Sequence, residues 1–183
     1  MTEKIKYELE FPIHASPNML YQYISSASNL SEWFADNVNS RGKIFENILE
    51  LGSGCGYQSA VLSFFSQNVD SIERIKPLVK KSIKNLSNLN IENVAFIHGD
   101  GYQDWDKKKK YDGILCAAAP RAYPDDLISV LNVNAKLVIP VGGSSQKLVV
   151  ISKNINNEIE EKKYDDVSFV PMLAGKSDDG TET

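Results

Sequence analysis

The sequence predicts an α/β fold in which helices cover both faces of a largely parallel sheet and antiparallel strands extend one edge. Two observations lead to this prediction. Short apolar segments alternate with helical patterns from Asn47 to Gly142, and strands separated by helices normally join in parallel through right-handed crossovers. After Gly142 the strand-like segments follow one another closely, which favours antiparallel pairing.

Short apolar runs indicate the strands. We expect the five parallel strands in NILEL, VDSIE, NVAFIHGD, YDGILCAAA and AKLVIPVG, which begin at residues 47, 69, 93, 111 and 135. Two further strands, KLVVISK and VSFVPML, follow a Gly142–Gly143 turn and an Asn156–Asn157 turn and should pair antiparallel at one edge. The residues from 176 to 183 are expected to form a flexible tail.

Apolar residues three and four positions apart indicate the helices between these strands. The first helix should bury the face formed by Tyr57, Ala60, Val61, Phe64 and Phe65. Pro77 opens the second helix, whose apolar stripe consists of Val79, Ile83 and Leu86. A short third helix is expected at residues 125–131.

The charge balance argues against a generic nucleic-acid binder. The 183 residues carry a formal net charge of -4, whereas proteins of that class neutralise phosphates with clustered lysine and arginine. The single basic run, Lys107 to Lys110, has no interleaved aromatic residues. We therefore interpret it as a solvated loop.

Cysteine usage and hydropathy indicate a reducing, cytoplasmic setting. Cys55 and Cys116 show no CxxC spacing, so we expect neither a metal site nor a disulfide framework. No apolar stretch approaches the ~20 residues that span a bilayer. No signal peptide is recognised at the start of the sequence either.

A glycine-dense turn between the first strand and its helix is the strongest functional signal. Gly52, Gly54 and Gly56 recur at every second position in LELGSGCGYQ. In an open alternating sheet, ligands bind at the carboxyl ends of the strands, where this turn should lie. The GxGxG spacing differs from the GxGxxG of dinucleotide-binding proteins, which disfavours an NAD enzyme. A tight packing turn remains the alternative interpretation of the glycines alone.

Two acidic residues at the ends of neighbouring strands narrow the choice of ligand. Glu73 ends the second strand, where a carboxylate can accept both hydroxyl hydrogens of a ribose. Asp100 follows the third strand, and Gly101 would let the backbone pass close to an adenine ring. Asp100 alone is equally compatible with a turn residue in GDGY. Together the two carboxylates favour a nucleoside without phosphates, and S-adenosylmethionine is such a nucleoside.

Six blocks between about residue 46 and residue 175 resemble, in their order and spacing, the protein-L-isoaspartate O-methyltransferase family. The blocks are NILELGSGCGYQSAVL, VDSIERIKPLV, NVAFIHGDGYQDW, YDGILCAAAP, NAKLVIPVGG and VSFVPMLAG. The resemblance implies a class I methyltransferase core with a Rossmann-like parallel sheet. It also implies methyl transfer from S-adenosylmethionine to the carboxyl group of L-isoaspartyl residues in damaged proteins, a repair reaction that releases S-adenosylhomocysteine.

The same resemblance implies the site residues. The cofactor would lie against Glu50, Gly52, Ser53, Gly54, Gly56, Tyr57, Gln58, Glu73, Arg74, Asp100 and Gly101. The wall where methyl donor and acceptor meet would be Ala118, Ala119 and Pro120. No catalytic residue is assigned, because a carboxylate acceptor with a pKa of ~4 is already ionised at neutral pH and needs no general base. The expected partners are isoaspartyl proteins or peptides, and the expected state is a monomer without metal, membrane or nucleic acid.

Residues 1–45 differ from the expected family pattern. They contain no match to the family's N-terminal substrate-binding segment. A strand at residues 5–11, a helix beginning at Ser16–Pro17 and a second helix in NLSEWFAD resemble instead the opening of a START-like domain. The chain is therefore interpreted as an atypical segment at 1–45, a methyltransferase core at 46–175 and a tail at 176–183.

Three alternative functions remain open at this point. The main one is an S-adenosylmethionine-binding core with impaired or no catalysis, because the substrate segment is missing. Methylation of a small molecule or nucleic acid is less favoured, since the chain is acidic and has CAAAP where base methyltransferases usually carry an Asn-Pro-Pro-Tyr type motif. A START-like lipid binder would need a long curved sheet that the sequence does not predict.

Overall fold

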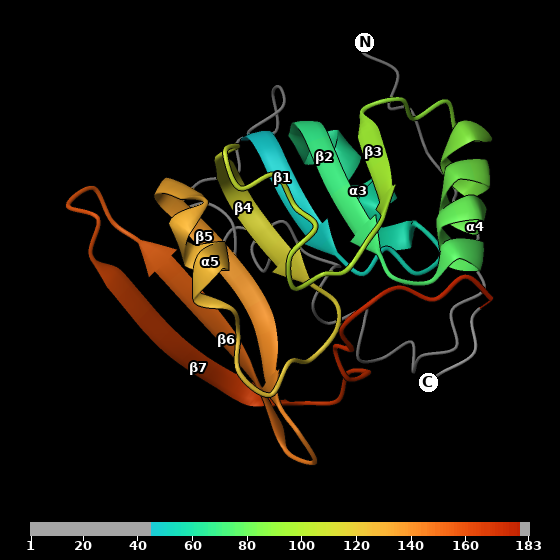
Figure 1. Ribbon diagram of the computed structural model, residues 1–183. Coiled ribbons are helices and arrows are strands. Elements are labelled where there is room, and N and C mark those ends of the chain that lie inside the picture. The colour runs from blue at the N-terminus through green and yellow to red at the C-terminus, as the bar shows by residue number, and fades with distance from the viewer. Residues whose placement is uncertain (1–44, 180–183) are drawn as a thin grey trace, which may run out of the picture.

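The computed structural model describes residues 45–179, which form one seven-stranded sheet flanked by helices (Figure 1). The elements are β1 (Phe45–Leu51), α3 (Tyr57–Phe65), β2 (Ser66–Glu73), α4 (Lys76–Ser87), β3 (Val94–His98), β4 (Tyr111–Cys116), α5 (Asp125–Ser129), β5 (Leu131–Gly142), β6 (Gln146–Lys153) and β7 (Ile159–Val167). The strand and helices expected before residue 45 lie outside the described residues, as does the end of the chain from residue 180.

The central part of the sheet is parallel, as the sequence predicts. The strand order is β3-β2-β1-β4-β5-β6-β7. β1 pairs in parallel with β2 and β4, while β2 pairs with β3 and β4 with β5 in the same sense. The order reverses its direction between β1 and β4, which is where open α/β sheets bind their ligands.

β6 and β7 extend the sheet by antiparallel pairing beyond β5, which confirms the predicted edge. Gly142 makes the tight connection from β5 to β6 possible. Its φ is 142°, and a Cβ at this position would lie 2.0 Å from the carbonyl oxygen of Ser145. Because no other residue fits that space, glycine is required at this turn.

The position predicted for the last strand is wrong. We expected it in VSFVPML, but β7 is the charged segment Ile159–Val167, which pairs with β6 as far as Gln146. Most side chains of β7 are exposed, so backbone pairing with β6, rather than burial of an apolar face, holds this outer strand. Its charged side chains disfavour pairing of the open edge with another chain. The apolar residues 169–173 run on past the strand, where Pro171 forms an isolated bridge with Ala119.

Helices lie on both faces of the sheet, as predicted; in Figure 1, α3 lies behind the sheet and α5 in front of it. On the first face Leu62 of α3 packs with Ile48 and Val69. On the other face Leu127 of α5 belongs to the main apolar cluster together with Leu49. Successive residues of β1 thus enter different cores, as expected for a strand buried on both faces.

The buried faces of α3 and α4 differ from those predicted. Of the face expected for α3, only Ala60 is buried, and Phe64 is 50% exposed. In α4, Ile83 is 50% exposed, and Ser82 is buried instead. The buried residues of α3 are Ser59, Ala60, Leu62 and Ser63. Small serines suit these contacts because each buried hydroxyl finds a polar partner, as Ser82 does with the carbonyl oxygen of Gly54 at 3.1 Å.

Residues 176–179 do not form the flexible tail that we predicted. Ser177 is 8% exposed, and its backbone N–H donates to the carbonyl oxygen of Arg74 at 2.8 Å. Its own carbonyl oxygen accepts from the Lys76 N–H at 2.9 Å. These contacts arise because residues 176–179 pass the start of α4, a long-range neighbour that the local sequence does not reveal.

Among the residues that the structure describes, no helix is long and apolar enough to cross a membrane.

Candidate functional site

Three glycines allow the chain to turn sharply from β1 into α3. Gly52, Gly54 and Gly56 have φ angles of 94°, 55° and 87°, a region that residues with a side chain disfavour. The Gly52 N–H donates to the carbonyl oxygen of Ile72 at 2.7 Å, so the turn is fixed to β2. The predicted strand-to-helix turn is present at the carboxyl end of the central strand.

The three glycines have different surroundings. A Cβ on Gly56 would come within 2.8 Å of Leu86 Cδ1, and a Cβ on Gly52 would contact Ala117 at 3.5 Å. A Cβ on Gly54 would meet nothing within 4 Å. Gly52 and Gly56 therefore permit close packing, whereas Gly54 faces the open side of the turn.

Glu73 lies against this open side. The Gly54 N–H donates to its Oε2 at 3.0 Å, and the Ile75 N–H donates to its Oε1 at 2.9 Å. The residue is 6% exposed. These two backbone donors orient the carboxylate towards the glycine turn, and each oxygen keeps a further lone pair. Binding of a ribose by Glu73 stays a prediction.

Asp100 organises the loop after β3. Its Oδ1 accepts from the Tyr102 N–H at 2.8 Å, and its Oδ2 accepts from the Gly175 N–H at 2.8 Å and from Gln103 Nε2 at 3.3 Å. These contacts are those expected of a turn residue, which is one of the two interpretations of Asp100. A direct bond from Asp100 to an adenine amino group stays a prediction.

Glu50, predicted to contact the cofactor, lies under α3 in this structure. Its side chain is fully buried and accepts hydrogen bonds from Gln58 Nε2 at 3.0 Å, from the Ser59 hydroxyl at 2.5 Å and from the Ser71 hydroxyl. Burial raises the pKa of the Glu50 carboxyl to about 7. Glu50 thus points to the face of the sheet that α3 covers, where it also binds Gln58. Contact of either residue with the cofactor stays a prediction.

Of the remaining predicted cofactor residues, Ser53 lies in the turn, Tyr57 begins α3 and Arg74 follows β2. Ser53 is 5% exposed, and its hydroxyl lies 3.3 Å from that of Ser82 in α4. Tyr57 and Arg74 are half-buried. The Nε of Arg74 is buried, and no hydrogen-bond partner for it exists among the described residues.

The predicted wall residues follow directly after β4. Ala118 is half-buried, whereas Ala119 and Pro120 are buried. The Ala119 N–H donates to the carbonyl oxygen of Val170 at 2.8 Å, and the Gly142 N–H donates to that of Pro120 at 2.9 Å. The wall is therefore held by two segments that come much later in the chain.

Residues 170–177, here termed the C-terminal strap, form a part of the site that our sequence reasoning missed. The strap runs from the end of the β6–β7 pair past the carboxyl ends of the parallel strands to α4 (Figure 1). Its backbone contacts Ala119, Asp100 and Arg74 by hydrogen bonds. The block VSFVPMLAG carried this signal, but we assigned its first residues to an edge strand.

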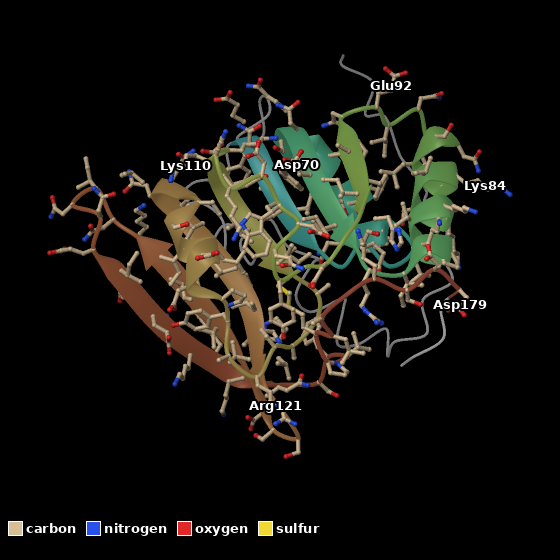
Figure 2. The ribbon with its side chains drawn as sticks, in the orientation of Figure 1. Asp70, Lys84, Glu92, Lys110, Arg121 and Asp179 are labelled. Carbon is tan, nitrogen blue, oxygen red and sulfur yellow. The ribbon has the colours of Figure 1, made fainter. Side chains whose placement is uncertain are left out.

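The basic run lies away from this edge. Figure 2 shows Lys110 and Asp70 towards the opposite end of the strands from Arg121. Lys109 Nζ is 2.7 Å from Asp70 Oδ2, and Lys107 Nζ is 2.7 Å from Asp126 Oδ2. Both lysines thus form ion pairs with acidic residues of other elements.

Comparison with known proteins identifies the family. The family model described as Protein-L-isoaspartate(D-aspartate) O-methyltransferase (PCMT) matches residues 6–177. The chain belongs to this family. The PCMT match begins at residue 6 and so includes most of residues 1–45, the segment that we interpreted as atypical. The START-like resemblance of that segment stays a prediction.

Curated relatives carry the same family name. A protein-L-isoaspartate O-methyltransferase of Aliivibrio fischeri is 42% identical over 130 residues, which are 71% of this chain and 62% of the relative. One of Alteromonas mediterranea is 35% identical over 165 residues, 90% of this chain and 75% of the relative. The aligned part of this PCMT chain thus spans less than two thirds of the Aliivibrio protein.

A solved structure agrees with the fold. A putative protein-L-isoaspartate O-methyltransferase of Plasmodium falciparum, in complex with S-adenosyl-L-homocysteine, is similar with a TM-score of 0.69 at 26% identity. The similarity covers 92% of this chain and 79% of that one. The predicted Rossmann-like methyltransferase fold of this PCMT member is confirmed.

Proposed function

We propose that the protein transfers a methyl group from S-adenosylmethionine to the carboxyl group of L-isoaspartyl residues in damaged proteins. The observation that carries this proposal is the contact between the Gly54 N–H and the Glu73 carboxylate at the open side of the glycine turn. This contact supports the proposal because a carboxylate, which is able to accept from the hydroxyls of a ribose, lies beside a backbone position with no neighbouring atoms within 4 Å of a Cβ. Membership of the PCMT family supports this choice of reaction.

The residues of the turn fit the proposed cofactor. Glu73 keeps lone pairs on both oxygens for a ribose diol, while Gly54 leaves the space above the turn free of a side chain. The Plasmodium relative holds S-adenosyl-L-homocysteine, which supports the same binding mode here. When bound, S-adenosylmethionine supplies an electrophilic methyl group.

The protein's own contribution would be to position the reactants and to exclude water. The acceptor carboxylate is ionised at neutral pH, with a pKa of ~4, so it needs no general base. Ala118 and its neighbours offer an apolar surface at the end of β4. Catalysis by orientation and removal of water suits such a site. We therefore assign no residue to proton transfer.

The experiment that tests this function measures transfer of labelled methyl from S-adenosylmethionine to an isoaspartyl peptide, with the matched aspartyl peptide as control. We expect base-labile label on the isoaspartyl peptide alone. Equal label on both peptides, or none on either, would reject the repair activity. Binding of S-adenosylhomocysteine without any transfer would select the alternative of a cofactor-binding core with impaired catalysis.

A pair of variants locates the cofactor in the same assay. Glu73→Gln replaces one of the two acceptor oxygens by an NH2 group, so the side chain can no longer accept from the Gly54 N–H, the Ile75 N–H and both hydroxyls of the proposed ribose together. This loss should raise the KM for S-adenosylmethionine about tenfold. Glu160→Gln makes the same substitution on exposed β7 and should leave the KM within about twofold. Equal KM values for the two variants would mean that the cofactor does not bind at the glycine turn.

We infer a cytoplasmic protein that acts as a monomer on isoaspartyl proteins or peptides. The acidic net charge of -4 supports a protein rather than a nucleic-acid substrate.

A further inference from the structure

Met172 connects the two sides of the candidate site through its backbone. Its N–H donates to the carbonyl oxygen of Ala119, in the predicted acceptor wall, at 2.8 Å. Its carbonyl oxygen accepts from the Tyr102 hydroxyl, in the loop after β3, at 3.1 Å. A single residue of the strap thus bonds to the acceptor side and to the side predicted for the adenine.

The side chain of Met172 fills the space between the same two sides. Its Cε lies 2.8 Å from the position that a Cβ on Gly101 would take. Its Sδ lies 4.0 Å from the Cys116 Sγ at the end of β4. Met172 is partly buried and packs against the main apolar cluster. Met172 therefore gives a steric reason for a glycine at position 101, in addition to any contact of Gly101 with a ligand.

The strap holds Met172 in place from both directions. On one side the carbonyl oxygen of Val170 accepts from the Ala119 N–H at 2.8 Å. On the other side the Gly175 N–H donates to Asp100 Oδ2 at 2.8 Å. Because both neighbours are fixed, Met172 cannot shift without moving either the wall or the loop that contains Gly101.

We propose that Met172 is a positioning residue, which sets the separation between the loop at Gly101 and the acceptor wall at Ala119. This inference rests on the proposed function, since the separation matters only if a methyl donor and its acceptor meet between these two elements. An unbranched thioether side chain suits this role because it fills irregular gaps between elements. Leucine has a similar volume and should replace it.

The test compares Met172→Ala and Met172→Leu with Val167→Ala. Val167 is a matched control, because it is also partly buried near the chain end but packs against Val138 and Leu148, away from the site. We would measure the Kd for S-adenosylhomocysteine by calorimetry, kcat and KM for an isoaspartyl peptide, and the Tm of each variant.

We expect Met172→Ala to lower kcat about tenfold and to raise the Kd for S-adenosylhomocysteine several-fold, with a peptide KM within about twofold of wild type. Met172→Leu should keep both kcat and Kd close to the wild-type values. Val167→Ala should lower the Tm by a similar amount without changing Kd or kcat. Met172→Val should change kcat and Kd in the same direction by a smaller factor. It replaces Met172→Ala in the comparison if that variant does not fold.

The outcomes separate this inference from the proposed function. If Met172→Ala lowers only the Tm, as Val167→Ala does, Met172 is merely structural and the inference is overturned. If wild type binds S-adenosylhomocysteine but does not methylate the isoaspartyl peptide, the proposed function fails, and the Kd values alone decide on Met172. A wild-type protein that binds no S-adenosylhomocysteine would overturn both.

Discussion

Glu50 shows how a single buried carboxyl couples stability to pH. Its pKa rises from 4.5 to about 7, because the cost of burying the charge exceeds the stabilisation by Ser59, Ser71 and Gln58. An acid whose pKa is higher in the folded than in the unfolded protein destabilises the fold once it ionises. This penalty is absent below about pH 4.5, grows between pH 4.5 and pH 7, and is complete above pH 7.

Replacing Glu50 by glutamine should therefore be more favourable at high pH. Relative to wild type, we expect the free energy of unfolding of Glu50→Gln to increase by about 2 to 3 kcal/mol between pH 5 and pH 8. Urea unfolding at both pH values measures this difference, and Glu160→Gln controls for the loss of one surface charge. The same relative stability of Glu50→Gln at both pH values would contradict a raised pKa at this site.

At the scale of elements, the close approach of α3 and α4 depends on the glycine turn. Gly56 lies at the N-cap of α3, and a Cβ there would lie 2.8 Å from Leu86 Cδ1 and 3.2 Å from the Cα of Ser82. The second of these atoms belongs to the backbone of α4 and cannot turn away. The two helices can therefore approach this closely only because position 56 has no side chain.

Replacing Gly54 or Gly56 by alanine distinguishes the stability cost of a steric clash with α4 from the cost of backbone strain. Both residues have a positive φ, so each substitution costs about 1 kcal/mol in strain. Gly56→Ala must also displace Leu86 and α4 and should cost about 2 to 4 kcal/mol in total. Gly54→Ala, whose Cβ meets nothing within 4 Å, should cost about 1 kcal/mol. Equal losses in urea unfolding would show that the α3–α4 contact does not depend on Gly56.

The C-terminal strap is the second element that decides the site. Gln146, at the start of β6, both donates to the carbonyl oxygen of Phe169 at 3.0 Å and accepts from its N–H at 2.7 Å. This paired contact continues the β6–β7 ladder by a side chain and directs the following residues towards Ala119. The strap therefore reaches the acceptor wall as a continuation of the antiparallel edge.

At the scale of the whole molecule, the sheet joins a deeply buried centre to an exposed edge. Ile48, Leu49 and Glu50 of β1 are each 0% exposed, and β1 has a paired strand on either side. β7 pairs only with β6, and most of its side chains are exposed. The predicted ligand side lies in the protected half, next to the carboxyl ends of β1 and β2.

This difference should appear in hydrogen exchange. We expect the backbone amides of β1 and β4 to exchange at least about a hundredfold more slowly than those of β7, because opening the outer strand exposes little apolar surface. Exchange followed by mass spectrometry of peptides that separate β1, β4 and β7 measures this ratio. If β7 were as well protected as β1, another chain or segment would have to cover the edge.

The sequence alone determined the order of most elements, the parallel centre, the antiparallel edge and the glycine turn with Glu73. These features follow from local information: the period of apolar residues distinguishes strand from helix, and only glycine fits the backbone of the turn. The family resemblance also rested on contiguous blocks, which is why the family was predicted correctly.

The tertiary structure alone decided which way several side chains face and which distant segments meet. Glu50 alternates along its strand like its neighbours, yet only the presence of α3 on that face buries it with Gln58. Similarly, residues 170–173 are apolar enough for a strand, but a hydrogen-bond partner more than fifty residues earlier, Ala119, draws them across the site. Such contacts depend on which surfaces meet in the folded chain, and a local pattern carries no information about a partner so far away in the sequence.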